Sequence, residues 1–360
     1  MTAQPAPHSA EAYESKFALW AVLIGSMAGV LMQALDSTIA NVALPYMEGS
    51  LSASYAQITW VLTSYIIAAA IMTAPVGWIA ARFGKKSFLI ISLSGFTIFS
   101  MACGAAQSLE QMVIFRLIQG AFGAALSPLS QAVMLDMYPP HKRGNIMAIW
   151  GMGVMLGPIL GPTLGGILTD NYSWRWVFYI NLPFGIAAVS AIAIFFKDTV
   201  RDSSLKFDWF GFGALAVGLA ALQLMLDRGT TKGWFDSSEI IIEAIIGGIG
   251  LYLFLVHLFL GKKPFIPISI FSDRNFVGGL VLMFVIGAVL LASSALISPY
   301  LQTMAGYTVT IAGLLMVPRG LGTMAAMTFA GRLTMKADPR VLMSAGAAAM
   351  AWSLWEMAHW

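Results

Sequence analysis

Long, uninterrupted apolar stretches dominate the chain, and short polar segments that carry charges separate them. Most of these stretches reach or exceed the length of about 20 residues that a helix needs to cross a bilayer. The polar and apolar alternation that is typical of transmembrane barrel strands is not found. The pattern therefore predicts an all-α, polytopic membrane protein. The eleven predicted spans are residues 17–45, 57–80, 87–107, 110–134, 145–168, 175–196, 208–226, 239–260, 276–298, 308–332 and 339–358.

The composition argues against a soluble domain and against an enzyme. Hydrophobic residues make up 58% of the 360 residues and charged residues only 10%, whereas soluble domains carry about 25% charged residues. A net charge of +3 is too weak and too dispersed for a nucleic-acid surface. Cys103 is the single cysteine, and the four histidines lie far apart, so we expect no disulfide and no metal. The sequence lacks a Gly-x-x-x-x-Gly-Lys-Ser/Thr phosphate loop, so we expect no cofactor and a proton gradient as the energy source.

The distribution of lysine and arginine predicts the orientation of the spans. With the N-terminus inside, fifteen of these residues fall in inner segments, and only Arg175, Arg228 and Lys232 fall in outer segments. Cytoplasmic loops carry such an excess, so a cytoplasmic N-terminus is expected. Residues 1–16 are polar and rich in proline and alanine, which predicts a disordered cytoplasmic tail before an uncleaved first span.

An internal sequence similarity predicts the domain organisation. The basic loop at residues 77–86 resembles residues 331–340, and both follow a predicted span on the inner side. Secondary transporters are commonly built from such repeats. The second repeat then has three of its six helices, so a truncated reading frame is expected rather than an odd-numbered protein. The predicted units are the tail, a six-helix bundle at 17–200, two inserted helices at 201–262, and the first three helices of an incomplete second bundle at 263–360.

Three ionisable residues stand out within the predicted spans, where a charge is costly and usually marks a pathway or a partner: Asp36, Arg116 and Arg319. Helical spacing places Gln33, Ser37, Ala40 and Asn41 on the side of Asp36, so a polar or small stripe is expected to face the interior. A carboxylate held there can bind and release a proton. The alternatives are that Asp36 only caps or pairs, and that Arg116 extends to the interface.

Further polar and glycine positions complete the candidate set. Gln119, one turn after Arg116, and Asn181, in the sixth span, are cavity candidates together with Gln33 and Asn41. The fifth span repeats glycine at every fourth position, which gives a smooth face for close helix contact. Its two prolines bend the helix and leave carbonyls that need partners. These residues are Gly153, Gly157, Pro158, Gly161, Pro162, Gly165 and Gly166.

These elements together resemble the major facilitator superfamily, and within it the fourteen-helix drug:proton antiporters of the EmrB/QacA type. The resemblance covers residues 17–358. Within this family the sequence most resembles the Emr-type exporters of Gram-negative bacteria. The motifs that carry it occur in the family's order at residues 35–45, 77–86, 116–120, 138–143, 157–166 and 226–229.

The resemblance implies roles for individual residues. Asp36 and Arg116 would take part in proton coupling, and the glycine-rich fifth span would act at the interface that rocks during transport. The basic loop would form a cytoplasmic gate through Gly77, Arg82, Gly84, Lys85 and Lys86. The chain departs from the family where Ala81 replaces the usual acid, and where Ala148 replaces a glycine.

The expected function is export of hydrophobic or amphipathic drugs across the bacterial inner membrane in exchange for protons. The resemblance also implies a periplasmic adaptor and an outer-membrane channel as partners, and no nucleic acid. Two alternatives remain open. The same fold could export or import a specific metabolite, or the chain could be a fragment that transports nothing.

Overall fold

The computed structural model describes residues 16–197, 201–261, 268–307, 309–333 and 337–359. Within these ranges every regular element is a helix, in agreement with the predicted all-α class. Most of the predicted tail, and the basic residues Lys262, Lys263 and Lys336, lie outside the described residues. The helices are α1 (Lys16–Ser50), α2 (Tyr55–Ile58), α3 (Trp60–Thr73), α4 (Val76–Phe83), α5 (Lys85–Ala105), α6 (Leu109–Gly123), α7 (Leu126–Met137), α8 (Arg143–Asn171), α9 (Trp176–Tyr179), α10 (Asn181–Phe195), α11 (Trp209–Lys232), α12 (Ser238–Leu260), α13 (Arg274–Pro299), α14 (Val309–Leu333) and α15 (Pro339–Met357).

The predicted spans match these helices to within a few residues at most ends. Three of the spans are interrupted: the second is divided into α2, α3 and α4, the fourth into α6 and α7, and the sixth into α9 and α10. Pro75 precedes α4 as its N-cap, where the missing N–H costs no helical hydrogen bond. Among the described residues, eight helices are long and apolar enough to cross a membrane. The last three of the eleven spans therefore stay predictions.

Helix α1 lies at the centre of the first ten helices and packs against α8, α10 and α7. The other large contacts of this bundle join α3 to α6, and α5 to α6 and α10. Two large apolar clusters fill most of it, and a smaller third one surrounds Leu23. Of the two large clusters, one surrounds Met32, Leu93 and Phe96, and the other surrounds Met47 and Val61. Because α1 contributes to both large clusters, the residues between Met32 and Ile39 lie where the two meet.

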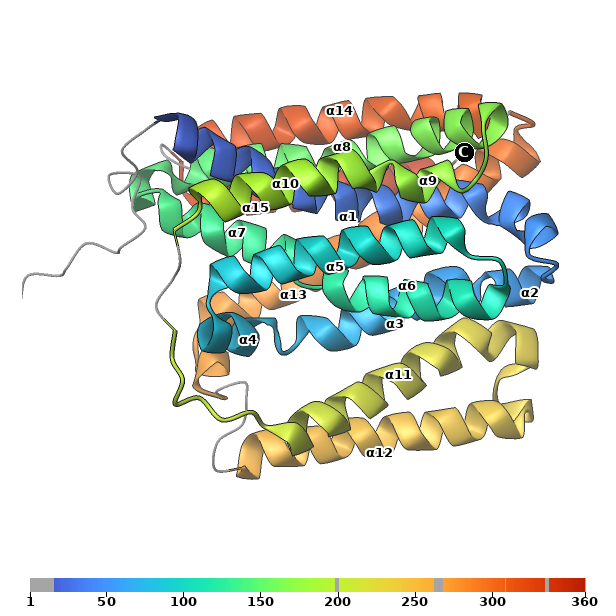
Figure 1. The fold of residues 1–360 in the computed structure, drawn as a ribbon, viewed down its shortest axis with the longest axis horizontal. Helices are drawn as coiled ribbons and strands as arrows, with labels where there is room; N and C mark the ends of the chain where they lie inside the picture. The colour runs from blue at the N-terminus through green and yellow to red at the C-terminus, as the bar shows by residue number, and fades with distance from the viewer. Residues whose placement is uncertain (1–15, 198–200, 262–267, 308, 334–336, 360) are drawn as a thin grey trace, which may run out of the picture.

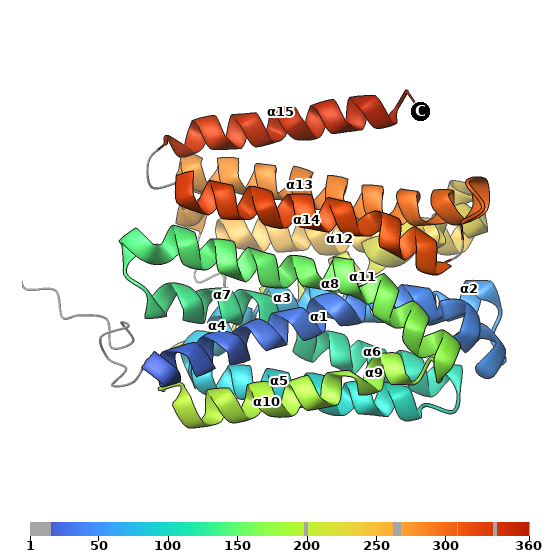
Figure 2. The ribbon, with the colours of Figure 1, turned by 90° about the horizontal axis from the view of Figure 1, so that it is seen from above.

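The other helices attach to this bundle at two places. Helices α11 and α12 pack against each other, and α11 also contacts α3 (Figure 1). Helix α14 packs along α8, while α15 lies at the outer edge of the molecule beyond α13 and α14 (Figure 2). The domain limits at residues 200 and 262 fall on residues outside the described ranges, so that division stays a prediction.

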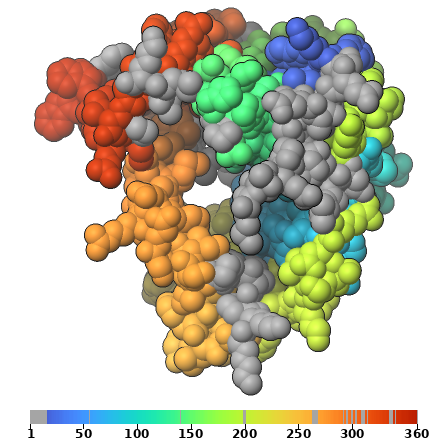
Figure 3. All heavy atoms as spheres, turned by 90° about the vertical axis from the view of Figure 1, so that its left-hand side faces the viewer, coloured from blue at the N-terminus to red at the C-terminus, as the bar shows by residue number. Residues whose placement is uncertain are grey.

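One end of the molecule gathers the predicted inner segments. The start of α1, the α4–α5 turn, the start of α11 and the end of α12 all lie at the left in Figure 1. Viewed from this end, the surface is hollowed between the orange residues of α13 and the green residues that follow α7 (Figure 3). We call this the basic end, because it carries Lys16, Arg82, Lys85, Lys142 and Arg143.

Candidate proton-coupling site

Asp36 of α1 and Arg116 of α6 form an ion pair in the interior of the bundle. Arg116 Nη1 lies 2.5 Å from Asp36 Oδ2, and neither side chain is exposed to solvent. Burying two charges is costly, and their attraction repays that cost only when further hydrogen bonds satisfy the remaining donors and acceptors. The structure brings together the two residues that the sequence singled out separately.

Gln119 adds two hydrogen bonds to this pair, while Arg116 Nη2 has no hydrogen-bond partner among the described residues. Its Nε2 donates to Asp36 Oδ1 at 3.0 Å, and its Oε1 accepts from Arg116 Nη1 at 3.0 Å. Arg116 and Gln119 are three residues apart, so they lie on the same side of α6. Each carboxylate oxygen of Asp36 therefore has its own donor, and one bridging amide ties the acid to the guanidinium.

Helix α3 also contacts the Arg116 guanidinium. Arg116 Nε donates to the Val61 carbonyl at 3.0 Å, and the guanidinium carbon lies 4.3 Å from the centre of the Tyr65 ring. The Phe178 ring lies 5.6 Å away. Aromatic faces attract cations, and the attraction grows when water is absent. Arginine stays charged here whichever form Asp36 adopts.

The sequence alone does not identify Val61, Tyr65, Phe178 or Cys103 as neighbours of the pair. The Cys103 thiol donates to Gln119 Oε1 at 3.5 Å. A backbone carbonyl such as that of Val61 leaves no mark in a sequence, because every residue carries one. Tyr65 gave a weak signal as a hydroxyl-bearing aromatic within an otherwise apolar stretch.

The polar and small residues expected to form one interior stripe on α1 differ in their exposure to solvent. Asp36 and Ala40 are buried, Gln33 is half-buried, and Ser37 and Asn41 are exposed. The Asn41 amide donates to the Ser37 carbonyl at 3.1 Å within the same helix. Asp36 thus points into the bundle, while the exposed part of the stripe lies on another side of α1.

Two further candidates lie apart from the ion pair. Asn181 of α10 is buried and donates to Ser100 Oγ of α5 at 2.9 Å, so it joins those helices instead of entering a cavity beside Asp36. Arg319 of α14 donates to the Leu290 carbonyl at 3.2 Å and to Ser293 Oγ at 2.7 Å, both on α13. Neither residue is in the Asp36 network.

The repeated glycines of α8 face α1. A Cβ added at Gly153 would lie 2.7 Å from Met27 Cε, and one added at Gly165 would lie 2.9 Å from Ile39 Cγ1. Between them, Gly157 abuts Ala34, and Gly161 abuts Thr38, whose Oγ1 also donates to the Gly157 carbonyl at 3.2 Å. We call this contact the α1–α8 seam.

The contact of α8 with α14 uses other residues. Gly320 and Gly331 of α14 abut Ile159 and Ala148 of α8, and Gly151 of α8 abuts Met327. The repeated glycines therefore serve contact within the first bundle, and not contact with α14. Gly166 is buried, Pro162 is half-buried and Pro158 is exposed. A rocking role for the helix stays a prediction.

The predicted gate loop forms the tight turn between α4 and α5. Gly84 has φ +90°, a backbone conformation that glycine adopts without penalty, and Lys85 forms an ion pair with Asp136 of α7. Gly77 is exposed, whereas Arg82 and Lys86 are half-buried. The Ala81 carbonyl accepts a hydrogen bond from the Asp202 N–H at 3.0 Å. An acid of α7 and the segment before α11 thus contact this turn.

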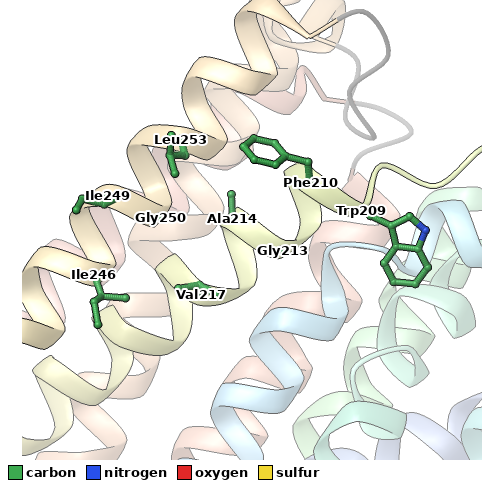
Figure 4. Close-up of a pocket in the computed structure, with 9 residues that line it drawn as sticks. All are labelled: Trp209, Phe210, Gly213, Ala214, Val217, Ile246, Ile249, Gly250 and Leu253. Carbon is green, nitrogen blue, oxygen red and sulfur yellow. The ribbon is translucent and has the colours of Figure 1, made fainter.

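An apolar groove of about 390 Å³ lies between α11 and α12 (Figure 4), and Asp36 is not among the residues that line it. Exposed aliphatic side chains such as Val217, Ile246 and Ile249 lie along it, as expected of helices in contact with lipid. The groove holds no titratable side chain, and Figure 4 shows its full lining: Trp209, Phe210, Gly213, Ala214, Val217, Ile246, Ile249, Gly250 and Leu253.

Curated relatives with similar sequences are exporters or resistance proteins. The chain is 41% identical to the multidrug export protein EmrB of Haemophilus influenzae over 317 residues, which is 87% of this chain and 62% of the relative. It is 39% identical to EmrB of Escherichia coli K12 over 87% of this chain and 61% of that protein. The fatty acid resistance protein FarB of Neisseria gonorrhoeae is 38% identical over 91% of this chain and 64% of its own length. The chain thus spans less than two thirds of the length of these relatives.

Solved structures and a family model place the fold. A crystal structure of the peptide transporter POT with sulfate aligns with a TM-score of 0.61 at 16% identity, covering 92% of this chain and 71% of that one. The proton:xylose symporter XylE aligns at 0.56 and 17% identity, covering 89% and 69%. The model of the Major Facilitator Superfamily matches residues 26–359. The chain is therefore a multi-pass membrane protein that belongs to the major facilitator superfamily.

Proposed function

We propose that this protein is a proton-coupled antiporter that exports hydrophobic or amphipathic compounds. The observation that carries the proposal is the fully buried Asp36–Arg116 pair with Gln119 as its bridge. An acid at this depth, paired with an arginine that cannot lose its proton, can exist in two states that differ by one charge. The names of the EmrB relatives support export as the direction and multiple drugs as the cargo.

Proton binding at Asp36 changes what holds α1 to its neighbours. In the ionised state the carboxylate accepts from both Arg116 and Gln119. Once Asp36 is neutral, the guanidinium keeps the Gln119 and Val61 oxygens and the Tyr65 ring, but loses its counterion. The two protonation states thus favour different arrangements of α1 against α6 and α3, which is what shifts a conformational equilibrium.

The direction of coupling follows from the proposed orientation. With the N-terminus and the basic end in the cytoplasm, Asp36 takes its proton from the outer side and releases it to the inside of the inner membrane. Substrate binds near the midplane, where Ser37, the residue after Asp36, and Asn41, five residues after it, have exposed side chains on α1. No cofactor is needed, since the proton gradient supplies the energy.

The substrate class has two candidates. Lipophilic cations fit the multidrug names of the EmrB relatives. Amphipathic acids fit the name of FarB, which is 38% identical over 91% of this chain. Both classes have an apolar body, and they differ in the sign of the head group. A periplasmic adaptor and an outer-membrane channel are proposed partners, supported by the family resemblance.

The test uses inverted vesicles in which the protein is expressed from its natural reading frame. A pH gradient is formed, and a lipophilic cation or a fatty acid is then added. A functional antiporter dissipates the gradient on addition of its substrate, and Asp36→Asn removes this response. Asp236→Asn, at an exposed acid between α11 and α12, serves as the matched control and keeps it. An inserted Asp36→Asn protein that responds at the full rate would overturn the proposed role of Asp36.

A further inference from the structure

The end of α11 contacts three different parts of the molecule through consecutive residues of its Leu226-Asp227-Arg228-Gly229 motif. Asp227 Oδ2 accepts a hydrogen bond from Thr63 Oγ1 of α3 at 2.9 Å. Thr63 is only 3% exposed. The carboxylate therefore reaches the neighbouring bundle and binds a hydroxyl that is closed off from solvent.

The next two residues fix α11 to α12 and to the turn between them. Arg228 donates to Glu243 Oε1 at 2.8 Å and to Glu239 Oε2 at 2.6 Å, both on α12. A Cβ at Gly229 would lie 2.6 Å from the Trp234 ring, so only glycine lets the turn approach this closely. The motif thus joins α3, α11 and α12, and we call it the three-helix joint.

The same stretch of α3 also contacts the buried ion pair. Val61, whose carbonyl accepts from Arg116, precedes Thr63 by two residues, and two residues turn a helix by about 200°. Tyr65 lies under the Arg116 guanidinium, and a Cβ at Gly120 would collide with the Tyr65 carbonyl. Residues 61–65 therefore lie between the ion pair on one side and α11 on the other.

The charged and titratable groups near each site are few. Around Asp36 they are Arg116, Tyr65 and Cys103. Around Asp227 they are the residues of the joint itself: Arg228, Lys232, Glu239 and Glu243. The contacts of Val61, Thr63 and Tyr65 join the two groups through one element, α3.

We propose that the α11–α12 pair is coupled to the proton site through α3, with the Thr63–Asp227 hydrogen bond as the connecting contact. The inference rests on the proposed role of Asp36 and assigns Asp227 as a positioning residue. When Asp36 becomes neutral, the Arg116 side chain changes its position, and its hydrogen bond to the Val61 carbonyl changes with it. Thr63 then passes the displacement of α3 to α11. The two helices that were predicted to be an insertion thereby take part in the transport cycle.

The test measures hydrogen–deuterium exchange in the full chain reconstituted in lipid nanodiscs, with no substrate present. Asp36→Asn imitates the neutral acid and is expected to increase exchange at residues 58–66 and also at 222–232. The expected rise at 222–232 is about fivefold, which corresponds to about 1 kcal/mol, the usual net value of one hydrogen bond. In the Thr63→Val background the rise at 222–232 disappears, while that at 58–66 persists.

Thr231→Val is the matched control, because Thr231 Oγ1 bonds only the Arg228 carbonyl of its own helix, at 2.9 Å. It is expected to leave the transmission from Asp36 unchanged. No rise at 222–232 in Asp36→Asn, or the same rise with Thr63→Val, overturns the proposal. These readouts need no transport, so they separate this inference from the proposed export activity.

A reciprocal variant covers the case in which Asp36→Asn does not fold. Coupling between two sites is equal in both directions, so Asp227→Asn is expected to increase exchange at residues 58–66. In vesicles the same variant is expected to shift the pH at half-maximal rate while leaving the substrate KM unchanged. Unchanged exchange at 58–66 in Asp227→Asn refutes the coupling.

Discussion

Removing one member of the buried ion pair leaves a charge without its counterion inside the bundle. In Asp36→Asn the Arg116 guanidinium keeps its bonds to Gln119 and Val61 but loses the carboxylate at 2.5 Å. In Arg116→Gln the carboxylate keeps Gln119 alone. Because both side chains are fully buried, water cannot replace the missing partner. Each single substitution is expected to cost about 3–5 kcal/mol of folding free energy.

The double variant Asp36→Asn/Arg116→Gln tests this reasoning, because it removes both charges and keeps groups that can hydrogen-bond. It is expected to be more stable than the sum of the single losses implies, with an interaction energy of about 2–3 kcal/mol. The assay is denaturant unfolding in detergent micelles near pH 7, followed by tryptophan fluorescence. Lys85→Ala is the comparison, since its ion pair with Asp136 is partly exposed and is expected to contribute about 1 kcal/mol or less.

Strict additivity of the two single losses would refute the reasoning. It would mean that the side chains contribute independently, as two packed groups would, and that the charge left behind is not the source of the cost. A loss at Asp36→Asn as small as that at Lys85→Ala would refute it as well, because it would show that solvent reaches the pair.

Two further predictions concern packing and the segment before α11. Gly161→Leu is expected to separate α1 from α8 at Thr38 and to lower both the unfolding midpoint and the transport rate. At Gly213 an added Cβ meets open space, so Gly213→Ala is expected to be neutral or to stabilise α11 by up to about 1 kcal/mol. Thermal unfolding of both variants checks this. The Ser204 hydroxyl and N–H bond the Asp202 carboxylate and lower its pKa, with Arg82 contributing. A lowered pKa in the folded state means that this stabilisation is present at neutral pH and is lost as the pH falls through that pKa. The protection factors of residues 201–208, which correct for the intrinsic pH dependence of exchange, are therefore expected to fall in acid, and not to do so in Asp202→Asn.

The sequence predicted the helices well, because the length of an apolar stretch is set directly by the bilayer. Their interruptions were harder to predict, because the break between α6 and α7 lies at Ala124 and Ala125, four residues before Pro128, which lacks the N–H that would bond the Ala124 carbonyl. Asp36 and Arg116 were evident from their cost inside a span. Their pairing across 80 residues depends on how α1 and α6 pack, and helical spacing alone does not determine that.

The same limit explains the candidates that lie elsewhere. Residues on one side of a helix can still face different neighbours. Asp36 and Asn41 lie on the same predicted stripe, but Asp36 is buried in the bundle and Asn41 is exposed. Asn181 has a buried partner, Ser100, that a single sequence does not reveal. The glycine repeat of α8 predicted close contact, but not that the partner would be α1.

The α1–α8 seam has a mechanical consequence. Gly157 and Gly161 bring the backbone of α8 directly onto Ala34 and Thr38, with no long side chain between the helices to bend or repack. Two helices in such contact are stiff toward each other and move together. Thr38 lies two residues after Asp36, whereas the opposite surface of α8 meets α14 partly through longer side chains such as Met327. We therefore expect a small displacement that starts at Asp36 to move α1 and α8 together, and the side chains at the boundary with α14 to be the first that can adjust to it.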